Sequence, residues 1–90
     1  MMKLLCREVT WAPGIVGPQS VDVPEASLLT LLAEGAPVQL SWGAEETLTV
    51  PAWEMGSQIV TGPVQAVLGL PGGAAPPQGV RAVLTIYRRG

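Results

Sequence analysis

The stretch that decides the fold is residues 36–53, "APVQLSWGAEETLTVPAW". Apolar side chains take every second position in residues 38–42 and again in residues 47–50, with Gln, Ser and Thr between them. A period of two with one apolar side is typical of a half-buried β-strand. Residues 43–46 suit a tight connection, so the sequence predicts a β-hairpin. Pro51 cannot donate to a strand ladder and marks the end of the second strand.

The segments on either side of this hairpin carry the same pattern. The longest run is residues 80–89, "VRAVLTIYRR", and shorter runs occupy residues 7–11, 19–23, 57–60 and 64–70. They are rich in β-branched side chains, which favour strands. The sequence therefore predicts a mainly β protein, a small antiparallel β-sandwich or barrel of about five to seven strands.

The last run has an unusual second side. Its alternate positions from Val80 onward are apolar and are expected to face the core, but the opposite side also carries Val83 and Tyr87. Apolar side chains on the outward side of a strand indicate contact with another molecule. We expect these two residues to belong to an interaction surface, together with Arg88, which is either solvated or paired with an acidic neighbour.

One stretch departs from the β pattern. In residues 23–35, "VPEASLLTLLAEG", Pro24 suits the first helical position and Gly35 suits the position just past a helix. Its leucines can form one stripe that packs on a sheet. The sequence predicts a short helix near residues 24–34, which would place the fold at the margin of the α+β class. An additional strand is the alternative, since consecutive leucines do not fix the period.

The chain is expected to form a single β-rich domain, residues 1–90, with one long loop at residues 70–79. Pro71, Pro76 and Pro77 favour an extended, polyproline-like path for that loop. We expect a projecting loop or arm that is either mobile or ordered by a neighbour, with these prolines among the interaction residues.

Charge is scarce in this sequence. Apolar residues make up 48% of it and charged residues only 13%, with a formal net charge of −2. Residues 55–80 carry no charge at all, yet their prolines and glycines exclude a membrane-spanning helix. A weakly charged surface permits self-association, and a small negative net charge gives no attraction for nucleic acid. We expect a homo-oligomer, with a trimer or ring favoured, that uses residues 55–80 and the last strand.

The residues that most catalysis requires are missing. The sequence has no histidine, and Cys6 is its one cysteine. Triads with histidine and thiolate metal clusters are thereby excluded, and no paired-carboxylate site is apparent among the seven acidic residues. We expect no enzyme, no catalytic or metal-binding residues and no cofactor. Cys6 is expected to be a small buried residue, with a reactive or intermolecular thiol as the alternative.

The three tryptophans, Trp11, Trp42 and Trp53, all stand at expected strand ends beside turn residues. Tryptophan combines a large apolar area with one N–H donor and suits core rims and interfaces alike. Because the chain contains no phenylalanine, some of the tryptophans must fill the core. The alternative is a platform for a peptide or a glycan, or a subunit contact, so all three are candidate interaction residues.

The first residues, "MMKLLC", place two leucines before a cysteine as lipoprotein signals do, but Arg7 and Glu8 follow at once. A secretory signal needs an apolar stretch of about 7 to 15 residues. We expect synthesis and use in the cytoplasm without a signal peptide, at least until any assembly is released.

In general character the chain resembles small virion proteins of tailed bacteriophages, of the head-decoration (cement) and head-tail or tail-tube types. The resemblance rests on the uncharged arm "GLPGGAAPPQG", residues 69–79, and on "PEASLLTLLAEG", residues 24–35, followed by "PVQLSW", residues 37–42. It implies a structural subunit that oligomerises or decorates a larger particle, and it identifies no functional residue. The alternative function is a small binding module that uses tryptophan to hold a peptide or a glycan.

Overall fold

The computed structural model describes the backbone of residues 2–23, 27–61 and 63–89, and the side chains of residues 4–23, 28–61 and 63–87. All regular structure in these residues is β-strand. The eight strands of this part of the chain are β1 (Met2–Trp11), β2 (Gln19–Val23), β3 (Ser27–Glu34), β4 (Val38–Ser41), β5 (Thr47–Val50), β6 (Met55–Val60), β7 (Val64–Gly69) and β8 (Val80–Arg89).

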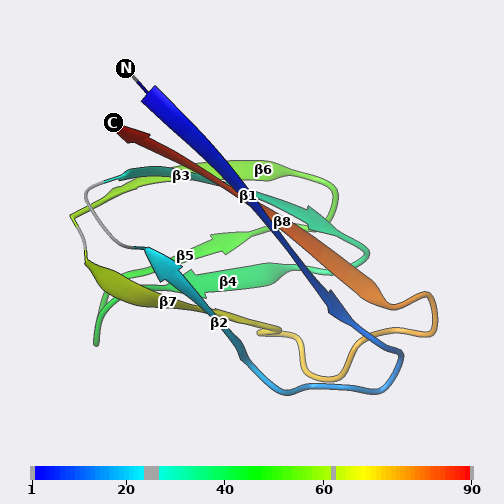
Figure 1. Ribbon diagram of the computed structural model, residues 1–90. Helices are drawn as coiled ribbons and strands as arrows, with labels where there is room; N and C mark the ends of the chain where they lie inside the picture. Colours follow the sequence, from blue (N-terminus) through cyan, green and yellow to red (C-terminus); the bar gives the residue numbers. More distant parts are fainter. Residues whose placement is uncertain (1, 24–26, 62, 90) are drawn as a thin grey trace.

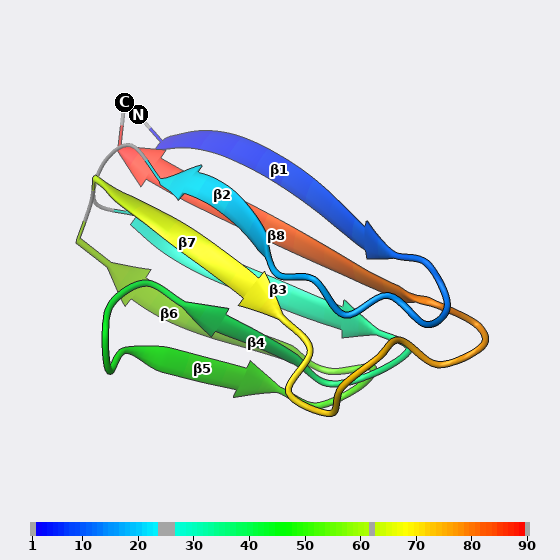
Figure 2. The same cartoon turned by 90° about the horizontal axis from the view of Figure 1, so that it is seen from below.

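Two four-stranded antiparallel sheets form a sandwich (Figures 1 and 2). The first sheet has the order β1-β8-β3-β6 and the second the order β2-β7-β4-β5. The chain changes sheet at every connection except the β4–β5 hairpin. An eight-stranded sandwich with this order, in which the first strand pairs with the last, is a jelly roll or double-stranded β-helix.

The core lies between the sheets and is built from alternate residues of each strand. Its largest fully buried side chains include Trp11, Leu29, Leu31, Leu40, Leu68, Leu84 and Ile86. The indole N–H of Trp11 donates to the carbonyl oxygen of Gly17 at 2.7 Å, so the polar atom of this buried ring has its partner.

The predicted sandwich, its central hairpin and its long last strand are confirmed. β4 and β5 pair from Val38 with Val50 to Ser41 with Thr47, and the Trp42 N–H donates to the carbonyl of Glu46 across the turn. β8 pairs with β1 on one side and β3 on the other, which places the last strand inside the first sheet.

The helix predicted near residues 24–34 is wrong. Residues 24–26 lie outside the described residues, and Ser27–Glu34 form strand β3. β3 is hydrogen-bonded to β8 along one edge and to β6 along the other. This strand also raises the total from the expected five to seven strands to eight in the described residues.

The physical reason is that β3 is apolar on both of its sides. Leu29, Leu31 and Ala33 are fully buried in the core, while Leu28 and Leu32 lie on the outer side of the sheet. The period of two is hidden in such a sequence, and neighbouring leucines resemble a helical stripe.

The long loop at residues 70–79 lies against the β1–β2 loop, residues 12–18. The Gly14 N–H donates to the Ala75 carbonyl at 2.9 Å, and the Ala75 N–H donates to the Ile15 carbonyl at 2.9 Å. Ala75 is buried. This part of the loop therefore has a neighbour within its own chain.

Gly35 brings the β3–β4 connection against the start of β8. Its φ of +99° lies in the left-handed region that glycine adopts freely. A Cβ at this position would stand 2.5 Å from the carbonyl oxygen of Gly79. Any side chain at residue 35 would push the two connections apart.

The uncharged span, residues 55–80, is divided between core and surface. Ala66 and Leu68 of β7 are fully buried in the chain's own core. Large exposed apolar side chains of the span, within the described part, are Met55 and Ile59 of β6. The expectation that the whole span faces a partner is therefore too broad, because only β6 leaves such side chains uncovered.

Candidate functional site

The two outer faces of the sandwich differ in polarity. Alternation along the strands and the strand register determine which side chains point outward. On the second sheet they are Ser20, Asp22, Gln39, Ser41, Thr47, Thr49, Gln65 and Val67. On the first sheet, seven are apolar, and these are called the apolar face: Leu4, Leu28, Leu32, Met55, Ile59, Val83 and Tyr87.

One row of the apolar face crosses all four strands. The register aligns Leu4 of β1 with Tyr87 of β8, Tyr87 with Leu28 of β3, and Leu28 with Ile59 of β6. Leu4 is 61% exposed and Ile59 71%. Side chains aligned across strands contact one another, so this row is continuous from one edge of the sheet to the other.

A second apolar row lies four residues farther along the strands. Val83 of β8 is aligned with Leu32 of β3, and Leu32 is aligned with Met55 of β6, which is 64% exposed. Between the two rows stand small side chains, among them Thr30 and Ser57, whose hydroxyl groups lie 3.2 Å apart. The middle of the face is therefore uncharged as well.

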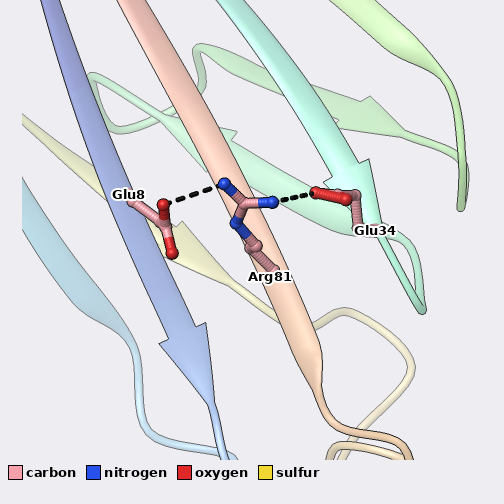
Figure 3. A network of polar contacts seen from close by, with 3 residues as sticks. All are labelled: Glu8, Glu34 and Arg81. Carbon is pink, nitrogen blue, oxygen red and sulfur yellow. Dashed lines mark hydrogen bonds and ion pairs between the residues drawn. The ribbon is translucent and has the colours of Figure 1, made fainter.

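Among the residues whose side chains the structure describes, the charged ones on this side of the first sheet gather at one end. Arg81 of β8 binds Glu8 of β1 through Nη2, with 2.9 Å to Oε2, and Glu34 of β3 through Nη1, with 3.2 Å to Oε2 (Figure 3). The hydrogen bond and charge of Glu8, followed by the charge of Glu34, raise the pKa of Arg81. Because the side chains are partly exposed, these ion pairs add little stability, but they hold three polar groups in a fixed arrangement.

Trp53 stands at the same end of the molecule, in the β5–β6 connection. Its side chain is 69% exposed, and its φ of +64° is in the left-handed region, which bulky residues rarely adopt. Its N–H donates to the Ala33 carbonyl at 2.7 Å, and the Ala33 N–H donates to the Glu54 carbonyl at 3.1 Å. The backbone that carries this indole is thus fixed to β3.

An open pocket of about 550 Å³ lies between Trp53 and the ion-pair group. Its lining residues are Thr10, Trp11, Ala12, Pro13, Glu34, Gly35, Trp53, Gln78, Gly79, Val80 and Arg81. Ends of β1, β3 and β8 contribute to it together with four connections. The lining is mainly apolar, with a carboxylate, a guanidinium, an amide and a hydroxyl group at its border.

The structure separates the three candidate tryptophans. Trp11 fills the core, and Trp42 is half-buried against it at the opposite end of the sandwich. Trp53 is the one aromatic side chain of the described residues that is mostly exposed. All three stand at strand ends, so their local sequence gave no means of telling them apart.

The other candidate residues fall in two places. Val83 and Tyr87 lie on the apolar face, half-buried by their neighbours. Pro71 and Pro77 are exposed and Pro76 is half-buried, all in the loop that lies against residues 12–18.

The side chain of Arg88 lies outside the described residues. The prediction from the sequence did not identify Leu4 or Leu28, and it included Met55 and Ile59 only as part of residues 55–80. The signals were the lack of charge in that span and the outward positions of Val83 and Tyr87, since aligning the other residues with them needs the strand register.

The described residues contain no group of three or more histidine, cysteine or acidic side chains suited to holding a metal ion. Within the same residues, no helix of sufficient length and hydrophobicity to cross a membrane is found.

No protein-family model matches the sequence, and no curated protein matches it. Solved structures that are similar in fold include the following two. A de novo designed double-stranded β-helix has a TM-score of 0.62 and 14% identity, covering 91% of this chain and 97% of the designed one. A structure of Bacillus endospore appendages, described as a family of disulfide-linked pili, has a TM-score of 0.53 and 16% identity, covering 98% of this chain and 86% of the other. At these identities the similarity shows that all three chains share the jelly-roll fold.

Proposed function

We propose that this chain is a non-enzymatic structural subunit that associates with further copies of itself through the apolar face. The observation that carries the proposal is the contrast between the two outer faces of one sandwich. One carries hydroxyl, amide and carboxylate side chains and, among the described residues, a single valine, and the other exposes Leu4, Met55 and Ile59 to water. A contiguous apolar patch on a small soluble domain marks an interaction surface, because removing it from water is favourable.

A second copy of the same face is the occupant that the chemistry favours. The apolar face has no excess charge at its centre, and the charges at its end already neutralise one another in part through Arg81. Two such faces can stack about 10 Å apart, as the sheets of a sandwich do. A two-fold axis would then place identical rows opposite one another.

The size of the face sets the expected strength of this contact. Four strands about 4.8 Å apart and the five residues from one row to the other at about 3.4 Å each give on the order of 330 Å² per copy. Two copies would cover about 650 Å² in projection, and the relief of the side chains raises this area toward the roughly 1,000 Å² at which specific interfaces begin. We expect association at micromolar concentration, strengthened by further contacts in a larger assembly.

The comparisons are compatible with an assembly role without specifying it. The Bacillus structure shares the jelly-roll fold and is described as forming pili, but an identity of 16% shows similarity of fold alone. A trimer or ring, and a place on a tailed-phage particle, remain proposals that rest on sequence composition. The non-enzymatic part of the proposal rests on the absence of histidine and on the pairing of Glu8 and Glu34 with Arg81.

The test is the mass in solution of Ile59→Lys beside the unchanged chain. Ile59 is largely exposed on an edge strand, where lysine is well tolerated, so the fold is expected to persist. Its charge would be buried if another copy covered the face, so the variant should be monomeric at 9.4 kDa while the unchanged chain has a multiple of that mass.

The matched control is Val16→Lys, which replaces a valine 55% exposed in the β1–β2 loop, away from the apolar face. Light scattering at micromolar concentration should give this control the mass of the unchanged chain. A multiple mass that Ile59→Lys retains, or that Val16→Lys loses equally, would refute the apolar face as the interface.

A further inference from the structure

Trp53 combines two features that folding alone does not favour. A bulky residue in the left-handed region raises the energy of the folded chain by about 1–3 kcal/mol, and 69% of the residue remains exposed. Burial of Trp53 offsets little of this strain, because most of the residue is exposed. Backbone strain of this kind is concentrated at binding sites, where the surrounding structure holds it.

The surroundings of Trp53 do hold it in place. The backbone of residues 53–54 exchanges hydrogen bonds with Ala33 in both directions, at 2.7 Å and 3.1 Å, and the Glu54 N–H donates to the Pro51 carbonyl at 3.2 Å. The close approach of Gly35 to Gly79 completes the adjoining border of the pocket. The ring is thus carried by a preformed site and not by a free loop.

The polar groups of the pocket are planar and nearly neutral as a set. Arg81 lies between Glu8 and Glu34, so its charge is already compensated, while its remaining N–H groups and the free carboxylate lone pairs stay available (Figure 3). Gln78 adds an amide and Thr10 a hydroxyl. An anionic ligand would meet the carboxylate of Glu34 in the lining and lie near that of Glu8, which is paired with Arg81, and a purely apolar ligand would leave the polar groups of the lining unpaired.

We propose that this pocket binds a neutral sugar ring, with one face of a pyranose against the indole of Trp53 and its hydroxyl groups against Glu34, Arg81 and Gln78. The electron-rich face of an indole attracts the weakly positive C–H groups of such a ring, as it attracts other positive edges. The planar side chains supply donors and acceptors for neighbouring hydroxyl groups. This inference concerns a site other than the apolar face and does not rest on the proposed function.

A proline-rich peptide fits the same pocket less well. Polyproline helices bind in grooves lined by several aromatic side chains. Here Trp53 is the one exposed aromatic side chain of the pocket, because Trp11 borders it but is only 2% exposed, and Tyr87 lies six residues from Arg81 along β8, about 20 Å away. The single exposed indole of Trp53, with polar side chains beside it, matches a single sugar ring with hydroxyl groups at its edge.

The test is nuclear magnetic resonance of the ¹⁵N-labelled chain, in which each tryptophan gives its own indole N–H signal. The probes are methyl glucoside, methyl mannoside, N-acetylglucosamine and lactose, with glucose 6-phosphate and decaproline as competing classes. At least one neutral sugar should shift the Trp53 signal in a saturable way, with half-saturation at about 1–10 mM for so small a ligand in an open site. The Trp42 signal, at the other end of the sandwich, should not move.

Trp53→Gly should weaken binding at least tenfold, read from the Gln78 side-chain signals, and Trp53→Phe should restore part of it. Repeating the titration on the Ile59→Lys variant separates this proposal from self-association, since sugar binding should persist in a monomer. Shifts with decaproline or glucose 6-phosphate but with no neutral sugar would overturn the proposal, as would no shift with any probe. A lower mass for Trp53→Gly would instead identify the pocket as a subunit contact and would also overturn it.

Discussion

The strain at Trp53 predicts an inverted order of stability for two small replacements. In regular structure, alanine is more favourable than glycine by roughly 0.5–1 kcal/mol, because glycine has more freedom to lose. At a φ of +64° that order should reverse. Trp53→Gly should be more stable than Trp53→Ala.

The magnitude follows from exposure and backbone geometry. About a third of the Trp53 surface is covered, on the order of 60–75 Å², so either replacement loses about 1.5–2 kcal/mol of apolar burial. Glycine also releases about 1–2 kcal/mol of left-handed strain, less its own entropic disadvantage. We expect Trp53→Ala about 1.5–2 kcal/mol below the unchanged chain, and Trp53→Gly about 1 kcal/mol above Trp53→Ala.

Urea unfolding followed by circular dichroism measures these differences in the free energy of unfolding. In thermal melts the glycine variant should unfold about 4–8 °C above the alanine variant, given the size of the domain. Both should be compared in the Ile59→Lys background, so that association does not contribute. An alanine variant as stable as the glycine variant, or more stable, would refute the claim that this residue is held in a strained conformation.

Three further predictions concern the fold and its charges. Gly35→Ala should lower the free energy of unfolding by about 2–4 kcal/mol, because its Cβ would meet the Gly79 carbonyl. The control is Gly14→Ala, which has a φ of +83° but open space around it and should lower the free energy of unfolding by only about 1 kcal/mol. Equal losses for the two variants in thermal melts would contradict the close approach of Gly35 to Gly79. Leu31→Ala should lower the free energy of unfolding by about 2–5 kcal/mol because Leu31 is fully buried. Leu28→Ala should lower it by about 1 kcal/mol or less because Leu28 lies on the outer side of the sheet. Similar losses for the two variants would argue against β3 as a strand. For Arg81→Gln, the expected effect of pH follows from the raised pKa of Arg81 in the folded chain. The contribution of Arg81 to stability is present below the ordinary arginine pKa and is lost only as the pH rises through the raised value. The difference in Tm from the unchanged chain should therefore be the same at pH 7 and pH 10, and a difference that vanishes between them would contradict the assigned partners.

The strands could be predicted where one side of the strand is apolar and the other polar. β4 and β5 are such strands, since Gln39 and Thr49 alternate with core residues. β3 could not be recognised in this way, because Leu28 and Leu32 make its outward side apolar too. The feature that misled the prediction, apolar residues on both sides of the strand, is also what forms the apolar face.

The candidate site could not be predicted from the sequence, for a different reason. Trp11 and Trp53 both stand at strand ends beside turn residues, and only the packing of distant strands buries one and exposes the other. Leu4 and Ile59 come together on one face through the pairing of β1 with β8 and of β3 with β6. Pairings between segments so far apart in the chain cannot be read from alternation alone.

The central claim is that another copy covers the apolar face, and the thiol of Cys6 can report it directly. Cys6, which the sequence predicted to be buried, is instead exposed on the outward side of the edge strand β1, while Ile59 lies on β6 at the opposite edge of the same sheet. The measurement is the alkylation rate of Cys6 as the protein concentration rises through the micromolar range. Alkylation should slow with concentration in the unchanged chain and stay fast in Ile59→Lys. A rate that is independent of concentration in the unchanged chain would contradict the claim.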